Sequence, residues 1–253
     1  MTKNLRVKSS EYIDETNRIS FKFNGKTYHG FKGDTLASAL LANDVHLVGR
    51  SFKYHRPRGI MTSGSEEPNA IVQVNPGTNR TEPNVRATEV EIYEGLEASS
   101  QNCWPSVEFD IGGINNFLSP FFPAGFYYKT FMWPASFWEK YEFFIRHSAG
   151  LGKSPTSSDP DIYDHRNIHC DVLVVGAGIS GILAAKNAAK NNFKTLLVDE
   201  KNELGGSTVY ENNEFNKIDN KAPSEWLKKE IEELKGIKTV SYTHLRAHET
   251  RCN

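Results

Sequence analysis

Residues 170–181 read CDVLVVGAGISG, the pattern of a buried strand, a glycine turn and the start of a helix. Residues 172–175 are consecutive apolar residues, and all but Leu173 are β-branched. Such a run favours a strand that is covered on both faces, as in a parallel sheet. Gly176, Gly178 and Gly181 then fit the spacing G-x-G-x-x-G.

Each glycine of this pattern has a separate expected role. Gly176 permits the tight turn, Gly178 lets a pyrophosphate approach the backbone, and Gly181 lets the helix pack close to the strand. The helix start at Ile179 and Ser180 offers free N–H groups and a partial positive charge, which favour a phosphate. The pattern therefore predicts a dinucleotide site at residues 176–181.

The next residues complete a strand–helix–strand unit. Residues 182–190 favour a helix, with a buried stripe expected at Ile182, Leu183, Ala185 and Ala189. Thr195–Val198 is a second strand-like run that ends at Asp199, 18 residues after Gly181. An acid near this spacing holds a ribose hydroxyl in dinucleotide folds. Glu200 competes for the role, because a strand end can shift by one residue.

A tight turn without a ligand is the alternative to a dinucleotide site. The order of strand, glycine turn, helix, strand and acid within about thirty residues favours the site. A diglycine, Gly205-Gly206 with Ser207, would let the backbone run close to the same ligand, or would form an ordinary turn. These residues do not distinguish NAD from FAD. A further helix is expected over residues 224–234, with Trp226, Leu227, Ile231 and Leu234 on its apolar side.

The overall composition is that of a globular protein: 253 residues, 38% hydrophobic and 24% charged. The net charge of −1 gives no bulk electrostatic case for nucleic acid or an anionic membrane. Cys103, Cys170 and Cys252 lack metal-ligand spacing and favour a reduced, cytoplasmic protein. No signal peptide is expected, and no apolar run approaches the roughly 18 residues of a membrane span.

The N-terminal part reads as a small β-grasp domain. Residues 19–31 have the alternation of a β-hairpin around Asn24-Gly25, a strong turn signal because both residues tolerate positive φ. Thr35 offers an N-cap for a short helix over residues 36–42. Residues 70–74 and 85–93 are further strand candidates.

Two segments outside these elements stand out. The basic loop 49–59, GRSFKYHRPRG, is either a solvated loop or a lining for an anionic cofactor or a subunit contact. The segment 101–152 is rich in aromatic residues, and residues 138–145 are a helix candidate within it. It is either a connector that packs on its own domains, the expectation for most of its side chains, or a surface that joins a partner subunit.

The end of the chain shows a change of character. A dinucleotide domain of two βαβ halves needs far more residues than follow Glu200. Residues 240–250 resemble translated adapter sequence at the end of a gene model, so we interpret 241–253 as a non-native tail. His244 and His248 are spaced like a metal pair but lack a third ligand. No metal site is predicted.

Several blocks together resemble one family. They are residues 33–43, 48–59, 66–70, 101–105, 124–132 and 149–152, with the glycine pattern and Asp199-Glu200. The chain resembles the N-terminal part of the alpha subunit of heterotetrameric sarcosine oxidase, from about residue 15 to residue 238. Related amine and opine oxidases share this N-terminal layout.

The resemblance implies an oxidoreductase complex that oxidatively demethylates sarcosine to glycine, with tetrahydrofolate or formaldehyde receiving the methyl carbon. It also implies NAD in this subunit, with FAD and FMN elsewhere in a heterotetramer with beta, gamma and delta subunits. Amine oxidation would then occur on the partner, so no catalytic residue is expected here. The fragment alone is expected to be inactive.

In cousins of this family the N-terminal domain holds an iron–sulfur cluster. The loop 60–67, IMTSGSEE, has no cysteine, and such a cluster needs thiolates. The expected fold is therefore α/β and α+β: a ferredoxin-like β-grasp domain without cluster cysteines (1–100), an aromatic connector (101–165) and the first half of a Rossmann-type domain (166–240). The rival functions are an FAD-binding subunit of an opine or amino-acid oxidase or dehydrogenase, and a structural subunit with an empty glycine loop.

Overall fold

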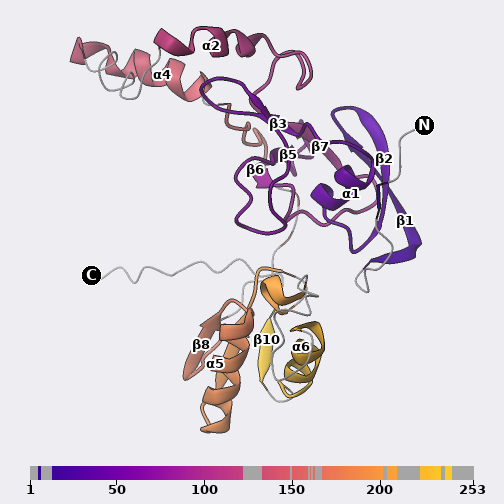
Figure 1. Ribbon diagram of the computed structural model, residues 1–253. Helices are drawn as coiled ribbons and strands as arrows, with labels where there is room; N and C mark the ends of the chain where they lie inside the picture. Colours follow the sequence, from indigo (N-terminus) through magenta and orange to yellow (C-terminus); the bar gives the residue numbers. More distant parts are fainter. Residues whose placement is uncertain are drawn as a thin grey trace. The chain divides into compact units, whose positions relative to one another are not determined.

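The computed structural model describes residues 5–6, 13–121, 133–148, 150–158, 160, 162, 167–201, 204–209, 223–234 and 237–240. The chain divides into two compact units, residues 1–162 and 163–253 (Figure 1). Unit 1 contains the segment expected as a β-grasp domain and nearly all of the expected connector. The C-terminal tail, 241–253, lies outside the described residues.

Unit 1 is built on a five-stranded sheet of order β2-β1-β7-β5-β6. The strands are Asp14–Phe23 (β1), Lys26–Lys32 (β2), Ile71–Val74 (β5), Glu82–Arg86 (β6) and Glu97–Ser100 (β7). β1 and β7 pair in parallel, and the other neighbours are antiparallel. A parallel pair of the first and last strands inside a mixed sheet is the arrangement expected of a β-grasp domain.

The predicted hairpin and helix of this unit are confirmed. Asn24 and Gly25 have φ of 50° and 76°, and they form the two-residue turn between β1 and β2. Helix α1, Leu36–Ala42, begins where the Thr35 Oγ1 accepts a hydrogen bond from the Ser38 N–H. Helix and sheet bury one core, which includes Phe21, Phe23, Leu36, Leu40, Val72 and Leu96.

The strands near the end of the sheet differ from the prediction. The expected strand 85–93 ends at Arg86, and residues 87–90 form a turn instead. β7, which lies between β1 and β5, was not predicted, because Glu97-Ala98-Ser99-Ser100 has few β-formers. Its strand state comes from pairing on both sides, which a local pattern does not reveal. A separate two-stranded ribbon joins β3, Gly49–Arg50, to β4, Pro57–Arg58.

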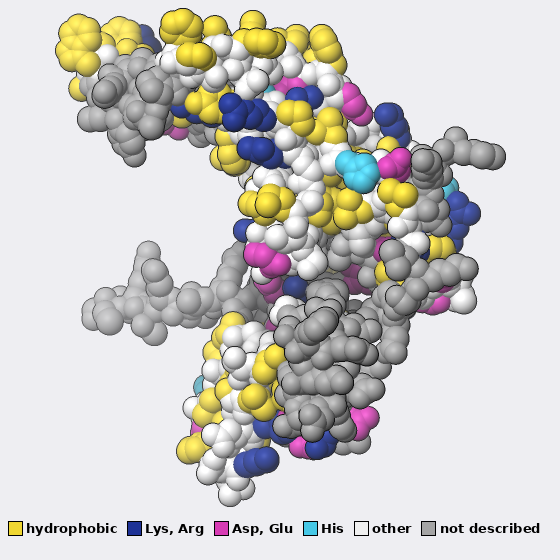
Figure 2. Space-filling view, in the orientation of Figure 1, with side chains coloured by type: hydrophobic (Ala, Val, Ile, Leu, Met, Phe, Trp, Pro, Cys, Tyr) yellow, Lys and Arg dark blue, Asp and Glu magenta, His cyan; other side chains and the backbone are white. Residues whose placement is uncertain are grey.

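The aromatic segment forms short helices that leave most of their described apolar side chains exposed. They are Ile111–Gly113 (η1), Ile114–Phe117 (α2), Ser119–Phe121 (η2), Ala135–Phe137 (η3) and Trp138–Ser148 (α4). Residues 122–132 lie outside the described part. Figure 2 shows hydrophobic side chains along this edge of unit 1, where Phe117 and Trp133 are 83% and 82% exposed. The expectation that most of these side chains pack on their own domains is wrong for these residues.

Unit 2 is a parallel strand–helix–strand unit with one further strand. Its sheet has the order β10-β9-β8, with β8 at Val172–Val175, β9 at Thr195–Val198 and β10 at Lys238–Val240. Helix α5, Ile179–Lys190, connects β8 to β9, and η4, Gly206–Val209, follows β9. Helix α6, Pro223–Glu232, buries Trp226 and Leu227 as predicted, and the Lys186 ammonium of α5 pairs with Glu230 and Glu233.

The burial of β8 differs from the prediction of a strand covered on both faces. β9 is buried along its whole length, but Leu173 and Val175 of β8 are 51% and 65% exposed. Leu183 of α5, which was expected in the buried stripe, is exposed as well, whereas Ile182 and Ala185 are buried. β8 is the outer strand of the described sheet, so one of its faces has no cover among the described residues.

Candidate functional site

The turn between β8 and α5 confirms the backbone roles of two glycines. Gly176 has φ of 94°, a left-handed conformation that favours glycine. A Cβ at Gly181 would lie 1.9 Å from the Gly176 carbonyl oxygen, so only glycine allows the helix this close to the turn. Gly178 has a negative φ of −69° and no atom within 4 Å of a Cβ position. The protein itself therefore leaves space over Gly178.

Helix α5 begins beside this space. Gly178 is its N-cap, with an extended ψ of −178° and no side-chain cap, and Ile179 and Ser180 are its first residues. The first N–H groups of a helix have no intrahelical acceptor, and the helix dipole adds a partial positive charge. The open ground above Gly178 is therefore a place where a phosphate can accept hydrogen bonds.

Asp199 lies directly under the glycine turn. Its Oδ2 accepts a hydrogen bond from the Ala177 N–H at 2.5 Å, and its Oδ1 accepts one from the Lys201 N–H at 2.8 Å. The carboxylate therefore fixes the turn to the end of β9, a role that the spacing argument did not predict. The Glu200 side chain is exposed at the same strand end. The assignment of either acid to a ribose hydroxyl stays a prediction.

The diglycine closes the site from a third segment. The Gly205 N–H donates to the Ala177 carbonyl at 2.7 Å, and a Cβ at Gly206 would lie 3.2 Å from the Gly178 Cα. Both glycines have positive φ, and Ser207 follows as an exposed residue at the start of η4. Gly205 and Gly206 thus pack on the glycine turn, as expected of a backbone that runs close to a shared ligand.

Ala177 is the residue that sequence reasoning missed. Its N–H meets Asp199 and its carbonyl meets Gly205, so it joins all three segments, and it is fully buried. It occupies a variable position of the glycine pattern, so no sequence signal marks it. The groups that face this place are backbone amides, glycine surfaces and hydroxyls or carboxylates at its edge, a set suited to binding rather than to proton transfer.

Comparisons with known proteins agree with these two units. A family model described as "2Fe-2S iron-sulfur cluster binding domain" matches residues 16–103, and one described as "FAD dependent oxidoreductase" matches residues 171–239. The first match spans nearly the whole five-stranded sheet and supports a ferredoxin-like domain. The second begins one residue before β8 and includes the site just described.

Two relatives match over nearly the whole chain. Sarcosine oxidase subunit alpha of Rhizobium meliloti (strain 1021) is 52% identical over 93% of this chain and 24% of the relative. The same subunit of Corynebacterium sp. (strain U-96) is 31% identical over 92% of this chain and 19% of the relative. The chain is a homologue of sarcosine oxidase alpha subunits. It spans about a quarter or less of the length of these relatives.

A solved structure shows a related fold for this alpha-subunit homologue. L-proline dehydrogenase from P. horikoshii aligns with a TM-score of 0.51 over 90% of this chain and 34% of that chain, at 16% identity. At this identity the likeness concerns the fold alone. None of the described helices combines the length and apolar character that crossing a bilayer requires.

The description of the first family model raises the question of an iron–sulfur cluster. A [2Fe–2S] cluster is held by four protein ligands, usually cysteines, and residues 16–103 contain Cys103 as their only cysteine. Within the described residues, no group of three or more His, Cys, Asp or Glu side chains could hold a metal ion. The residues present therefore do not fit such a cluster.

The loop that was expected to lack cluster ligands is folded around a carboxylate. Glu67 is 1% exposed, and its oxygens accept the N–H groups of four residues: Met61 and Thr62 at 2.7 Å, Asn69 at 2.8 Å and Ala70 at 3.2 Å. Burial raises the pKa of the Glu67 carboxyl, but these N–H groups lower it further, so the pKa lies below its ordinary value. The loop is thus organised by an ionised side chain.

The basic loop 49–59 makes contacts that neither sequence interpretation foresaw. The Arg50 guanidinium donates to the carbonyls of Val107, Glu108 and His55, at 2.8, 3.0 and 3.2 Å. The Arg56 Nε donates to the Asn116 Oδ1 at 2.7 Å, and its guanidinium lies over the Tyr54 ring. These two arginines hold the aromatic segment to the sheet.

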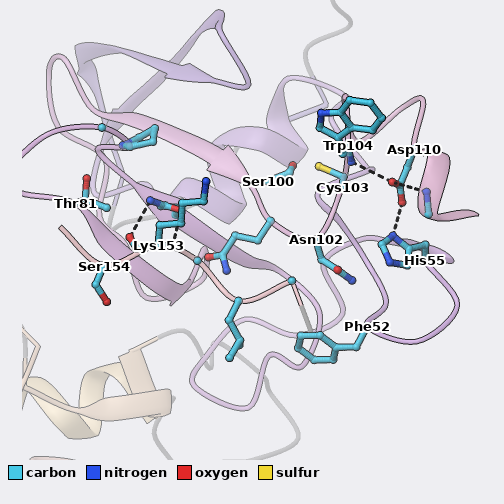
Figure 3. Close-up of a pocket in the computed structure, with 18 of the residues that line it drawn as sticks. Phe52, His55, Thr81, Ser100, Asn102, Cys103, Trp104, Asp110, Lys153 and Ser154 are labelled. Atoms are coloured by element: carbon cyan, nitrogen blue, oxygen red, sulfur yellow. Dashed lines mark hydrogen bonds and ion pairs between the residues drawn. The ribbon is translucent and has the colours of Figure 1, made fainter. Parts of the chain in front are cut away.

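A cavity of about 1350 Å³ lies in unit 1 beside these contacts. Figure 3 shows Asp110 between the backbone N–H of Trp104 and the His55 ring, whose Nδ1 is 2.6 Å from Asp110 Oδ2. Burial and the Asp110 charge raise the pKa of the Cys103 thiol nearby, so this thiol is a poor nucleophile near neutral pH. The pair His55–Asp110 fixes the start of the aromatic segment.

Proposed function

We propose that unit 2 binds the ADP half of a dinucleotide cofactor within an oxidoreductase subunit. The observation that carries the proposal is the open space over Gly178 beside the uncapped start of α5. Gly176, Gly178, Gly181 and the helix start at Ile179 and Ser180 would hold the pyrophosphate. Asp199 or Glu200 would accept a ribose hydroxyl, and Gly205, Gly206 and Ser207 would border the nucleotide. In this proposal β8, α5 and β9 form the first half of a Rossmann-type domain.

The identity of the dinucleotide is the finer part of this proposal. The ADP half is common to NAD and FAD, and the residues around Gly178 treat both alike. The match to an FAD dependent oxidoreductase model favours FAD. NAD, which the resemblance to sarcosine oxidase implied for this subunit, gains no support from these comparisons. When bound, either cofactor supplies a hydride acceptor, whereas the residues described here bind and orient it.

At the level of the complex we propose a sarcosine oxidase. The relatives named sarcosine oxidase subunit alpha support this assignment through 52% and 31% identity. The complex would convert sarcosine to glycine with FAD and FMN, transfer the methyl carbon to tetrahydrofolate or release formaldehyde, and include beta, gamma and delta subunits. A cytoplasmic location, no nucleic acid partner and no membrane partner stay predictions from composition.

The experiment that tests the proposal is extraction of nucleotide from the purified full-length complex. Acid-released cofactor is separated by chromatography and identified by mass. FAD released from the isolated alpha subunit supports the proposal in its favoured form, and NAD released from it supports the site but reverses the cofactor choice. An alpha subunit that holds neither dinucleotide would leave the structural-subunit alternative. Activity assays with sarcosine and with proline or an opine then separate the sarcosine oxidase assignment from its enzyme rivals.

A further inference from the structure

The aromatic segment of unit 1 presents a large apolar surface. We define the aromatic arm as the described residues of 109–121 and 133–144. Its exposed side chains include Phe109, Phe117, Phe121, Trp133, Trp138 and Phe144. Figure 2 shows hydrophobic side chains along the α2 and α4 edge of unit 1. Neither the β-grasp core nor the glycine site explains why so many aromatic residues face outward here.

The exposed area is that of a protein interface. An aromatic side chain offers about 150–250 Å², so these six residues at their observed exposure present roughly 800 Å². The largest apolar patch on a typical monomer is about 300–600 Å². A stable protein–protein interface takes about 800 Å² from each partner. The arm therefore exceeds an ordinary surface patch and matches one side of a stable interface.

The composition of the arm indicates a polypeptide partner. Residues 111–121, IGGINNFLSPF, contain no charged residue and no histidine. Helices that lie on membranes carry Lys and Arg on their polar face, and here that face offers asparagine and serine instead. Aromatic enrichment with few charges is characteristic of the buried centre of permanent protein interfaces.

The helices of the arm also need packing to be stable. α2 has four residues and α4 has eleven, and isolated helices shorter than about 12–15 residues are marginal in water. Phe137, Tyr141 and Phe144 recur at intervals of four and three residues, so they share one face of the η3–α4 segment. A cover over this face would stabilise the helices through apolar burial.

The base of the arm, in contrast, is fixed. Arg50 donates to the carbonyls of Val107 and Glu108, Arg56 to Asn116, and His55 pairs with Asp110. These contacts position the arm on the sheet and leave its aromatic faces outward. A pre-positioned surface loses less conformational entropy when it binds, which favours a stable complex.

We propose that the aromatic arm is the docking surface for a different subunit of the enzyme, through an apolar and charge-poor surface of that subunit. The inference rests on the proposed function only for the identity of this partner as another subunit of the complex. A second copy of this chain and the remainder of a longer alpha polypeptide are the competing covers. They are distinguished by the experiment below.

The test replaces Phe117 and Phe121 together by Asp in the full-length alpha subunit, co-expressed with its partner subunits. The matched control is Phe193→Asp, because Phe193 is 52% exposed in unit 2, outside the arm. The arm variant should lower the amount of partner subunit that copurifies at least tenfold, and the control should not. Equal copurification for wild type and arm variant would overturn the proposal.

Hydrogen exchange then identifies the cover. In wild-type alpha subunit expressed alone, amides of residues 111–121 should exchange at least tenfold faster than in the complex. Protection already present in monomeric alpha would assign the cover to its own polypeptide, and protection in a dimer of alpha would assign it to a second copy; either result overturns the proposal. Nucleotide content is measured on the same samples. Loss of partner with nucleotide retained separates this inference from failure of the dinucleotide site.

Discussion

At the scale of single residues, the glycines of the β8–α5 turn are required for different reasons. The left-handed φ of Gly176 and the close approach of Gly181 to the Gly176 carbonyl are demands of the fold. Gly178 has neither demand, because its φ is negative and its Cβ position is open. The remaining reason for glycine at position 178 is the ligand.

This difference gives a paired prediction for Gly181→Ala and Gly178→Ala. The Gly181 variant forces a backbone shift, because its Cβ would meet the Gly176 carbonyl, and overpacking of this kind costs about 1–3 kcal/mol. The Gly178 variant should leave the free energy of unfolding within about 0.5 kcal/mol of wild type. Denaturant unfolding of ligand-free protein measures both. A Gly178 variant as unstable as the Gly181 variant would remove the argument that position 178 is reserved for a ligand.

Asp199 has a structural role that its position in the sequence did not reveal. Both of its oxygens accept backbone N–H groups, from Ala177 and Lys201. Asp199→Asn replaces one acceptor oxygen by a donor, so it should loosen the turn and weaken dinucleotide binding about tenfold or more, since a charge-assisted hydrogen bond contributes about 1.5–3 kcal/mol. Nucleotide titration followed calorimetrically measures the change.

Glu200→Gln is the matched comparison, because the Glu200 side chain is exposed at the same strand end. If Glu200 alone holds the ribose, the Gln variant should lose affinity while the turn stays intact. Unchanged affinity in both variants would show that neither acid contributes, and the fingerprint would then lose its fourth element.

The buried Glu67 predicts a dependence of stability on pH. Its pKa is lowered in the folded state, so its contribution is fully present above the unfolded value near 4.5 and is lost as pH falls through the folded pKa. Glu67→Gln keeps the shape but removes the charge that four N–H groups face, at a cost of about 1–3 kcal/mol at pH 7. The gap between wild type and variant in free energy of unfolding should narrow below pH 4.5. A gap that stays constant from pH 7 to pH 3 would refute an ionised Glu67. Glu66→Gln, an exposed neighbour, is the control.

At the scale of elements, the sequence predicted what local chemistry specifies. The hairpin around Asn24-Gly25 and the helix start at Thr35 follow from turn and cap residues, and the order β8–α5–β9 follows from apolar runs and glycine spacing. β7 could not be found, because Glu97–Ser100 becomes a strand only through pairing with β1 and β5. The exposure of Leu173 and Leu183 was likewise beyond a local pattern, since burial depends on which segments cover a face.

The contact between the basic loop and the aromatic segment is also non-local, and it predicts an effect of Arg50. Arg50→Lys keeps the charge but loses the fork that reaches the carbonyls of Val107 and Glu108 together. We expect a loss of about 1–3 kcal/mol in the free energy of unfolding of unit 1. Thermal unfolding of Arg50→Lys beside Arg18→Lys, an exposed arginine of β1, measures it. Equal unfolding of the two variants would show that the loop is not bound to the segment in solution.

At the scale of the whole molecule, two surfaces lack a cover among the described residues. One is the aromatic arm of unit 1, and the other is the face of β8 that carries Leu173 and Val175. The sequence foresaw the aromatic enrichment but not its exposure, because composition does not say which side of a segment meets another. The relatives are about four or more times as long as the matched part, so their further residues or partner subunits are the candidates for these covers.

The central claim is that the glycine turn of unit 2 holds a dinucleotide, and nucleotide content tests it most directly. Full-length alpha subunit and its Gly178→Val variant are purified in parallel, and released FAD and NAD are quantified per mole of protein. We predict about one dinucleotide per wild-type subunit and less than a tenth of that in the variant, because the valine side chain fills the space that the pyrophosphate needs. Equal dinucleotide content in the two proteins would contradict the account.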